Sequence, residues 1–135
     1  MKNVLKKGCI ILFVLTVFGV FVSQISARQI AGYDITIPRF NNITTGYLIK
    51  EGYTNAIHRN NAIGGNKRIN TAIKNANTGS DITSVYQMGA GDRIALAYNG
   101  GAGAYVNTAT TLSVSTPVST VVRVQAQGSW SPDAQ

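Results

Sequence analysis

Residues 105–127, YVNTATTLSVSTPVSTVVRVQAQ, decide the fold class because they contain the two longest strand candidates of the chain. β-Branched residues, which favour strands, are abundant in both halves of this stretch. In the second half, alternate residues would share one face of a strand: Val118, Thr120, Val122, Val124 and Ala126. Pro117 has no N–H for a sheet ladder, so it separates an expected strand at 105–115 from another at 118–127.

Five shorter runs on the N-terminal side of this stretch show a similar pattern and are expected to be strands: 33–37, 45–50, 68–74, 81–88 and 93–98. Clusters of Asn, Gly, Ser and Asp separate most of them and mark turns. Asn99-Gly100 is the strongest short hairpin signal, because both residues tolerate a positive φ. Residues 51–67 are the least regular stretch and are expected to form a loop.

No stretch after residue 27 shows the apolar period of a helix, so an all-β domain is predicted. About seven strands between turn signals favour two antiparallel sheets packed as a small β-sandwich. A closed barrel would produce the same pattern, and the sequence leaves that alternative open.

Residues 1–27 have the parts of a secretory signal peptide. Three lysines precede a 15-residue apolar run at 8–22, which is followed by polar residues and small Ala27. We therefore expect a signal-peptide helix, cleavage between Ala27 and Arg28, and one β-rich mature domain over 28–135. The apolar run is shorter than the roughly 20 residues that a stable transmembrane helix needs. The alternative to a cleaved signal peptide is an uncleaved membrane anchor.

Charge and cysteine content indicate the compartment. Cys9, the only cysteine, lies in the leader, so the mature domain has no disulfide. This composition favours a secreted bacterial protein, and a Gram-positive source in particular. Residues 28–135 contain nine basic and five acidic residues, a formal charge of +4 that keeps the domain soluble and permits weak attraction to anionic surfaces.

Catalytic candidates are few. His58 is the only histidine, so a hydrolase of the Ser-His-Asp type would have to use it. It lies in the irregular stretch 51–67, where an exposed loop position is expected. A glycosidase would need two facing carboxylates, but nothing in the sequence selects a pair from the five acids, Asp34, Glu51, Asp81, Asp92 and Asp133.

Metal and cofactor motifs are weak as well. Residues 75–81 alternate oxygen ligands as a calcium loop does, but they lack a closing Glu, and a turn is favoured. We expect no metal, no cofactor and no nucleic-acid partner, and membrane contact only through the leader.

Trp130 is the one residue with two opposed interpretations. It is expected to lock the last strand to the domain, and the alternative is a surface contact with a cell envelope.

The C-terminal third resembles a known kind of exported protein. Its segments MGAG (88–91), RIALAY (93–98) and GSWSPD (128–133) resemble a family of small uncharacterised exported proteins of Gram-positive bacteria. More distantly, the chain is similar to lactococcin-type β-sandwich bacteriocins, which are also exported, small and cysteine-free. The resemblance implies a secreted β-sandwich and no catalytic residue.

The expected function is therefore a secreted, non-enzymatic protein that acts at or outside the bacterial cell surface. Its partner, whether the cell envelope or another secreted protein, stays open. The first alternative is a bacteriocin-like antimicrobial protein that acts on an envelope, and the second is a small secreted hydrolase that uses His58.

Overall fold

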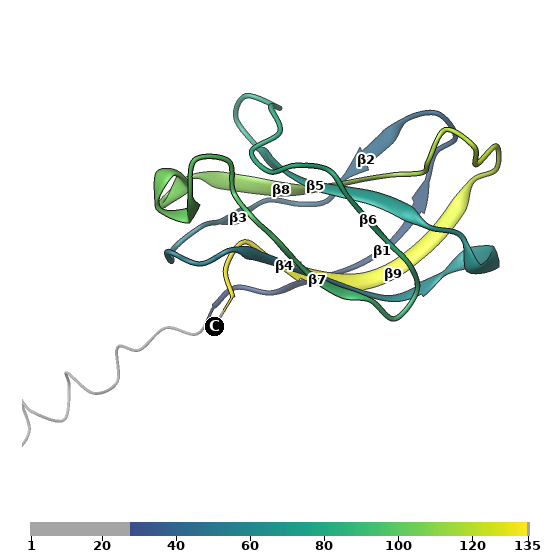
Figure 1. Cartoon of the computed structure of the whole chain (residues 1–135), viewed down its shortest axis with the longest axis horizontal. Helices are drawn as coiled ribbons and strands as arrows, with labels where there is room; N and C mark the ends of the chain where they lie inside the picture. Colours follow the sequence, from purple (N-terminus) through teal and green to yellow (C-terminus); the bar gives the residue numbers. More distant parts are fainter. Residues whose placement is uncertain (1–27, 135) are drawn as a thin grey trace, which may run out of the picture.

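The computed structural model describes residues 28–134, which form two antiparallel β-sheets packed face to face (Figure 1). One sheet has four strands in the order β1-β9-β4-β7. The other has five, in the order β2-β8-β5-β6, with β3 also paired to β8. The predicted β-sandwich is confirmed, while the predicted signal-peptide helix at 1–27 lies outside the described residues.

Most connections cross from one sheet to the other, so neighbours in the sequence are seldom neighbours in a sheet. The strands are β1 (Ala31–Ile37), β2 (Asn42–Thr44), β3 (Leu48–Ile49), β4 (Ala56–Ile63), β5 (Ile69–Asn75), β6 (Tyr86–Met88), β7 (Arg93–Leu96), β8 (Ala109–Ser115) and β9 (Val124–Ser131). Two short 3-10 turns are η1 (Gly64–Asn66) and η2 (Ala102–Tyr105). No helix within residues 28–134 has the length and apolar character needed to cross a membrane.

Apolar side chains from both sheets fill the space between the layers, because alternate residues of each strand point inward. The larger fully buried members are Ile37, Ile69, Ile73, Met88, Leu96, Leu112, Val114 and Trp130. Both sheets and this core lie within residues 28–134, so we expect the chain from Arg28 onward to fold without the leader.

Strand β9 joins the two ends of the chain. On one edge it pairs with β1, from Ala31 opposite Trp130 to Ile37 opposite Val124. On its other edge it pairs with β4, with a bulge between Asn60 and Ala62. The two ends therefore lie together at one end of the sandwich (Figure 1), where the Arg28 guanidinium donates a hydrogen bond to the carbonyl oxygen of Asp133 (3.4 Å).

The structure corrects the expectation that residues 51–67 form a loop. This stretch contains β4, which lies between β9 and β7. Two of its buried positions hold His58 and Asn60 in place of apolar residues. Polar residues at inward positions remove the apolar alternation that marks a strand, which is why the pattern missed β4.

The strand predicted at 118–127 is also misplaced, because β9 begins only at Val124. The preceding strand, β8, belongs to the other sheet, so residues 116–123 are needed to cross between the layers. Val118 is consequently 91% exposed, and Val121 and Val122 are more than half exposed.

The hairpin predicted at Asn99-Gly100 is wrong, although a tight turn is present. Gly101 N–H bonds to the carbonyl of Tyr98 (3.1 Å), and Gly100 has a φ of +80°. The strands on either side, β7 and β8, lie in different sheets, so they cannot pair with each other. Local turn chemistry predicted the turn but not the partners of the strands.

Gly128 provides a test of this packing. A Cβ at Gly128 would collide with the Arg59 carbonyl oxygen and lie 2.7 Å from the Tyr33 hydroxyl. We expect Gly128→Ala to lower the free energy of unfolding by about 2–3 kcal/mol in urea denaturation. The control is Gly46→Ala, where nothing lies within 4 Å, with an expected change below about 0.5 kcal/mol. Equal effects of the two substitutions would contradict the close approach of β1, β4 and β9.

Candidate functional site

The candidate catalytic residue His58 lies inside the sandwich, with a fully buried side chain. Its Nε2 is 2.5 Å from the Tyr33 hydroxyl, and its Nδ1 is 2.9 Å from Thr71 Oγ1. Asn60 Nδ2 donates to the Tyr33 hydroxyl (3.0 Å), which leaves that hydroxyl free to donate to His58. Protein groups therefore occupy both nitrogens of the imidazole.

The expectation of an exposed loop histidine is therefore wrong. Strand β4 turns His58 inward, opposite Trp130 of β9. Burial lowers the pKa of His58 to about 4, so the imidazole is neutral near pH 7. A buried ring with both nitrogens occupied has no access to a substrate in this structure, so the hydrolase hypothesis gains no support from its only candidate histidine.

Four of the five acidic side chains are bonded to neighbouring groups, and the fifth residue, Glu51, lies beside Asp133, whose Oδ2 accepts a hydrogen bond from the Glu51 N–H (2.8 Å). Asp34 accepts hydrogen bonds from Gln125 and Gln127, Asp81 pairs with Lys74, Asp92 accepts from Gly89 N–H, and Asp133 pairs with Lys50. Within residues 28–134 there is no group of three or more His, Cys, Asp or Glu side chains that could hold a metal ion.

The calcium-like stretch at 75–81 is a turn, as favoured from the sequence. Asn75 Oδ1 accepts hydrogen bonds from the backbone N–H groups of Asn77 (2.9 Å) and Thr78 (3.4 Å). The amide oxygen thus stabilises the turn in the way typical of Asn at such positions.

Trp130 lies in the core with 1% of its surface exposed. This burial is what the interpretation that it locks β9 to the domain requires, and it lends no support to the alternative of an envelope contact through this indole.

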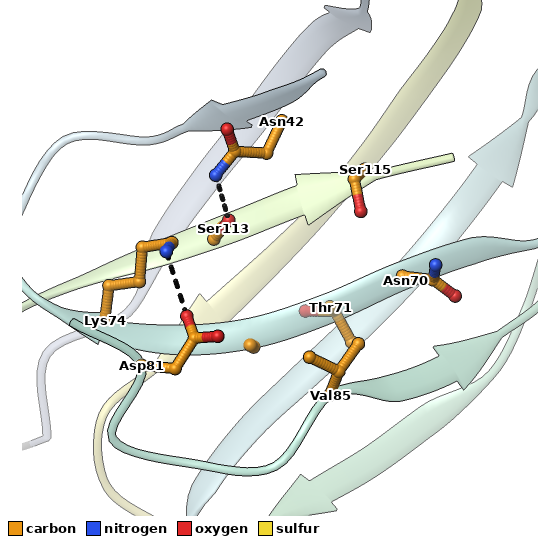
Figure 2. A pocket seen from close by; sticks show the side chains of 9 residues that line it. Asn42, Asn70, Thr71, Lys74, Asp81, Val85, Ser113 and Ser115 are labelled. Atoms are coloured by element: carbon orange, nitrogen blue, oxygen red, sulfur yellow. Dashed lines mark hydrogen bonds and ion pairs between the residues drawn. The ribbon is translucent and has the colours of Figure 1, made fainter. Parts of the chain in front are cut away.

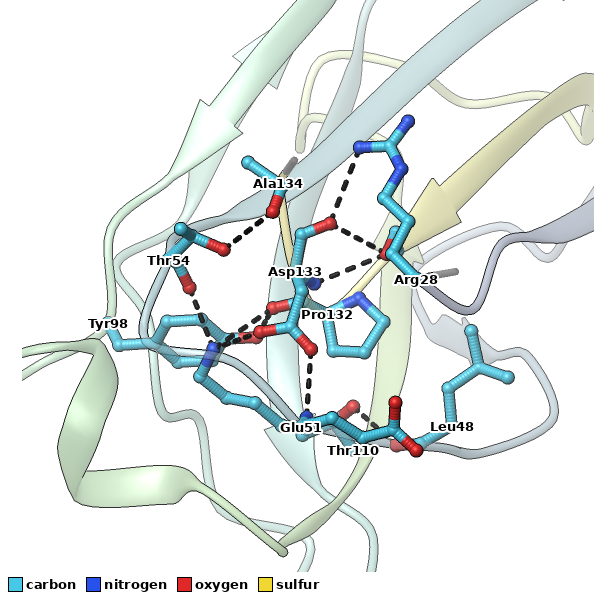
Figure 3. A network of polar contacts seen from close by, with 11 residues as sticks. Arg28, Leu48, Glu51, Thr54, Tyr98, Thr110, Pro132, Asp133 and Ala134 are labelled. Atoms are coloured by element: carbon cyan, nitrogen blue, oxygen red, sulfur yellow. Dashed lines mark hydrogen bonds and ion pairs between the residues drawn. The ribbon is translucent and has the colours of Figure 1, made fainter. Parts of the chain in front are cut away.

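A buried ion pair fastens the C-terminal tail to the loop before β4 (Figure 3). Lys50 Nζ lies 2.5 Å from Asp133 Oδ1 and 2.7 Å from the Thr54 carbonyl oxygen. Burial raises the pKa of Asp133, but the hydrogen bonds from Lys50 and from backbone N–H groups outweigh burial and hold it below its ordinary value. The Tyr98 hydroxyl donates to the Pro132 carbonyl (2.7 Å), so the tail is bound at successive residues.

At the opposite end of the sandwich, two connections carry exposed apolar side chains (Figure 1). One connection joins β1 to β2, and the other joins β8 to β9. We call this region the loop-end surface, and it consists of Arg39, Phe40, Val118, Val121, Val122 and Arg123. Phe40 is 70% exposed and Val118 is 91% exposed.

The two connections are held together. The Arg39 guanidinium donates to the Val121 carbonyl (3.2 Å) and lies 5.7 Å from the centre of the Phe40 ring. In the longer connection, Thr120 N–H bonds to the Pro117 carbonyl (2.8 Å), and the Thr120 side chain is buried. The apolar side chains therefore project from a hydrogen-bonded base.

Phe40 has a φ of +63°, in the left-handed region that bulky residues rarely adopt. Asn or Gly would occupy this position at lower cost. Backbone strain of this kind concentrates at functional positions, and here it accompanies an aromatic ring exposed to water.

A hollow of about 520 Å³ adjoins the loop-end surface. Phe40, Pro117 and Val118 line one part of it, and the rest is polar, with Asn41, Asn42, Asn70, Ser115 and Thr116. A smaller polar groove of about 140 Å³ continues from it across the five-stranded sheet (Figure 2). In that groove, Asn42 donates to Ser113 Oγ (3.0 Å) and Lys74 pairs with Asp81 (3.0 Å), so these groups are already bonded to each other.

The sequence analysis considered Trp130 as a surface contact only as an alternative, and it did not consider Phe40 and Val118. The sequence feature that could have indicated this surface is the group of valines after Pro117, since connections are usually polar. Alternation favoured assigning that run to a strand, and only the sheet order shows that it is a connection.

No protein-family model matches the chain, and no curated protein sequence or solved structure matches it either. The resemblance to small exported Gram-positive proteins, and more distantly to lactococcin-type bacteriocins, therefore stays a prediction.

The burial of His58 predicts a loss of stability in acid. Its pKa is about 4 in the folded chain and near 6.5 when exposed, so the unfolded chain binds the proton more readily. Stabilisation from the neutral ring is complete above pH 6.5 and is lost as the pH falls toward 4, by roughly 3 kcal/mol. Urea denaturation at several pH values measures this slope.

The control for that slope is His58→Gln, which keeps a polar side chain at the position but cannot titrate. We expect its free energy of unfolding to vary much less between pH 6.5 and 4. A wild-type protein with constant stability over this range would contradict a buried neutral imidazole.

The ion pair predicts unequal effects of two otherwise similar substitutions. Asp133→Asn leaves the buried Lys50 ammonium without its counter-ion, and we expect a loss of about 3 kcal/mol or more in the free energy of unfolding. Asp81→Asn also removes a lysine partner, but at a more exposed pair, and is expected to cost less than about 1 kcal/mol. Thermal or urea unfolding at pH 7 compares them, and equal losses would contradict the buried pair.

Proposed function

We propose that residues 28–135 form a secreted, non-enzymatic binding protein that acts at or outside the surface of a bacterial cell. The loop-end surface is the proposed contact. Export rests on the signal-peptide pattern of residues 1–27 and on the absence of cysteine after Cys9. The exposed apolar side chains of this surface would contact the partner, because they are not part of the core of the domain.

The observation that carries this proposal is the exposure of Phe40 together with three valines on two connections that are bonded to each other. Clustered apolar side chains on a soluble domain commonly mark an interaction site. Because hydrogen bonds already hold the two connections together, less conformational entropy is lost when a partner binds. The surface also lies at the end of the sandwich opposite the C-terminus, where Arg28 bonds to Asp133 (Figure 1).

Three features support a non-enzymatic role. His58 is enclosed in the core, four of the five acidic side chains are bonded to neighbouring groups, and no metal-binding group of three or more His, Cys, Asp or Glu occurs within residues 28–134. The hollow beside Phe40 is lined by amides, hydroxyls and apolar groups, which suit binding more than proton transfer.

A second candidate is a bacteriocin-like antimicrobial protein that acts on an envelope. The observation that favours it is the exposure of Arg39 and Arg123 on the same two connections as the exposed apolar side chains, in a mature chain of net charge +4. Apolar groups flanked by arginine are typical of proteins that act on anionic envelopes.

Phe40→Asn provides the test, because Asn tolerates a positive φ and the change relieves strain instead of creating it. The exported form, residues 28–135, is mixed with washed Gram-positive cells at low and high salt, and protein in the pellet and viable cells are scored. We expect wild type to bind and Phe40→Asn to bind about tenfold less, since a buried Phe contributes about 1.5–3 kcal/mol.

The matched control is Tyr53→Asn, which removes an aromatic ring that is 78% exposed near the termini, and it is expected to bind as wild type does. Equal binding by the Phe40 and Tyr53 variants would remove the loop-end surface from the proposal. Falling viability together with binding would favour the antimicrobial candidate over the first one.

A further inference from the structure

The loop-end surface presents the two chemical features of a lipid contact together. Its apolar part projects outward, with Val118 at 91% and Phe40 at 70% exposure. Its cationic part consists of Arg39 and Arg123, which are both exposed. We propose that this surface docks on an anionic lipid bilayer, with the apolar side chains in the interface and the guanidinium groups on lipid phosphates. This proposal rests on the proposed function and names its partner.

Shape favours a bilayer over a folded protein as the partner. Val118 is almost fully in water at the tip of a connection, and Val121 and Val122 are more than half exposed. A folded partner would need a pocket that fits these projections, whereas the boundary between headgroups and acyl chains accepts apolar side chains without a preformed pocket.

Charge favours an anionic bilayer. No acidic residue occurs between Asp34 and Glu51 or between Asp92 and Asp133, so both connections lie in stretches that carry only positive charge. The ion pairs found within residues 28–134 are Lys50–Asp133 and Lys74–Asp81, and neither involves Arg39 or Arg123. A guanidinium binds phosphate oxygens with two parallel hydrogen bonds, which suits lipid headgroups.

The adjoining hollow provides space for a headgroup. It measures about 520 Å³ and lies between the apolar side chains of Phe40 and Val118 and a polar wall that includes Asn42 and Asn70. Amide groups can donate hydrogen bonds to phosphate and glycerol oxygens. The lipid would therefore meet apolar groups at the tip and hydrogen-bonding groups behind it.

Orientation is consistent with docking by this end. Strand β1 runs from the termini toward the loop-end surface, and its seven residues span about 20 Å at the usual rise per residue. The buried ion pair and the C-terminal tail lie at the far end (Figure 1 and Figure 3) and would stay in water. Four apolar side chains make a shallow contact, so binding is expected to be reversible and to need anionic lipid.

The test uses the exported form, residues 28–135, and co-sedimentation with two kinds of vesicle. One kind contains phosphatidylcholine alone, and the other also contains phosphatidylglycerol. We expect binding to the anionic vesicles only, decreasing as salt is added. Phe40→Asn should weaken it about tenfold, and Arg123→Gln about fivefold at low salt with a shallower salt dependence.

Matched controls identify the surface. Tyr53→Asn removes an exposed aromatic ring near the termini, and Arg93→Gln removes an exposed arginine on β7. Both variants are expected to bind vesicles as wild type does. If they weaken binding as much as the Phe40 and Arg123 variants do, the contact is not the loop-end surface and the proposal is overturned.

Two further outcomes separate this inference from the proposed function. Wild type that binds washed cells but not anionic vesicles would overturn the lipid partner and leave the cell-surface role in place. Wild type that binds neither cells nor vesicles would overturn both. Equal binding to both kinds of vesicle would contradict the role of Arg39 and Arg123.

Discussion

The arrangement of the domain depends on β9, the last strand, being hydrogen-bonded along both edges. It pairs with β1 at the start of the described chain and with β4 in the middle, so three distant segments form one sheet. Gly128 permits the close approach of Tyr33 and the Arg59 carbonyl that this pairing requires. The tail after β9 then brings Asp133 to Lys50 and closes that end of the sandwich.

The same pairing explains why polar residues lie in the core. β4 directs His58 and Asn60 inward, where Tyr33 of β1 and Thr71 of β5 provide hydrogen-bonding partners. The hydrogen bonds among these groups offset part of the cost of burying them, but Asn60 Oδ1 is buried without a hydrogen-bond partner among residues 28–134, and an unpaired polar group in a core is destabilising. The histidine that was expected in an exposed loop is therefore part of the folded interior.

The connections that cross between the two sheets place the apolar residues of the loop-end surface outside the core, at one end of the sandwich. The β1–β2 and β8–β9 connections both change layers there, and Arg39 bonds to Val121 between them. Phe40 stays exposed at a strained φ, while the valines between Pro117 and Val124 find no place in either sheet. A surface of this kind is a consequence of topology, and its proposed role is to meet a partner outside the cell.

The sequence by itself determined the all-β class and the approximate positions of most strands, because alternation along a strand is local. The alternation is kept throughout β1 and β7, whereas β5 and β8 each contain three successive buried residues. It also determined the turn at 75–81 through Asn75. Only the tertiary structure decided that β4 is a strand, that 118–123 is a connection and that Trp130 is buried while Phe40 is exposed. Those properties depend on which strands pair across the sandwich, and that pairing joins residues too far apart in the chain for a local pattern to record.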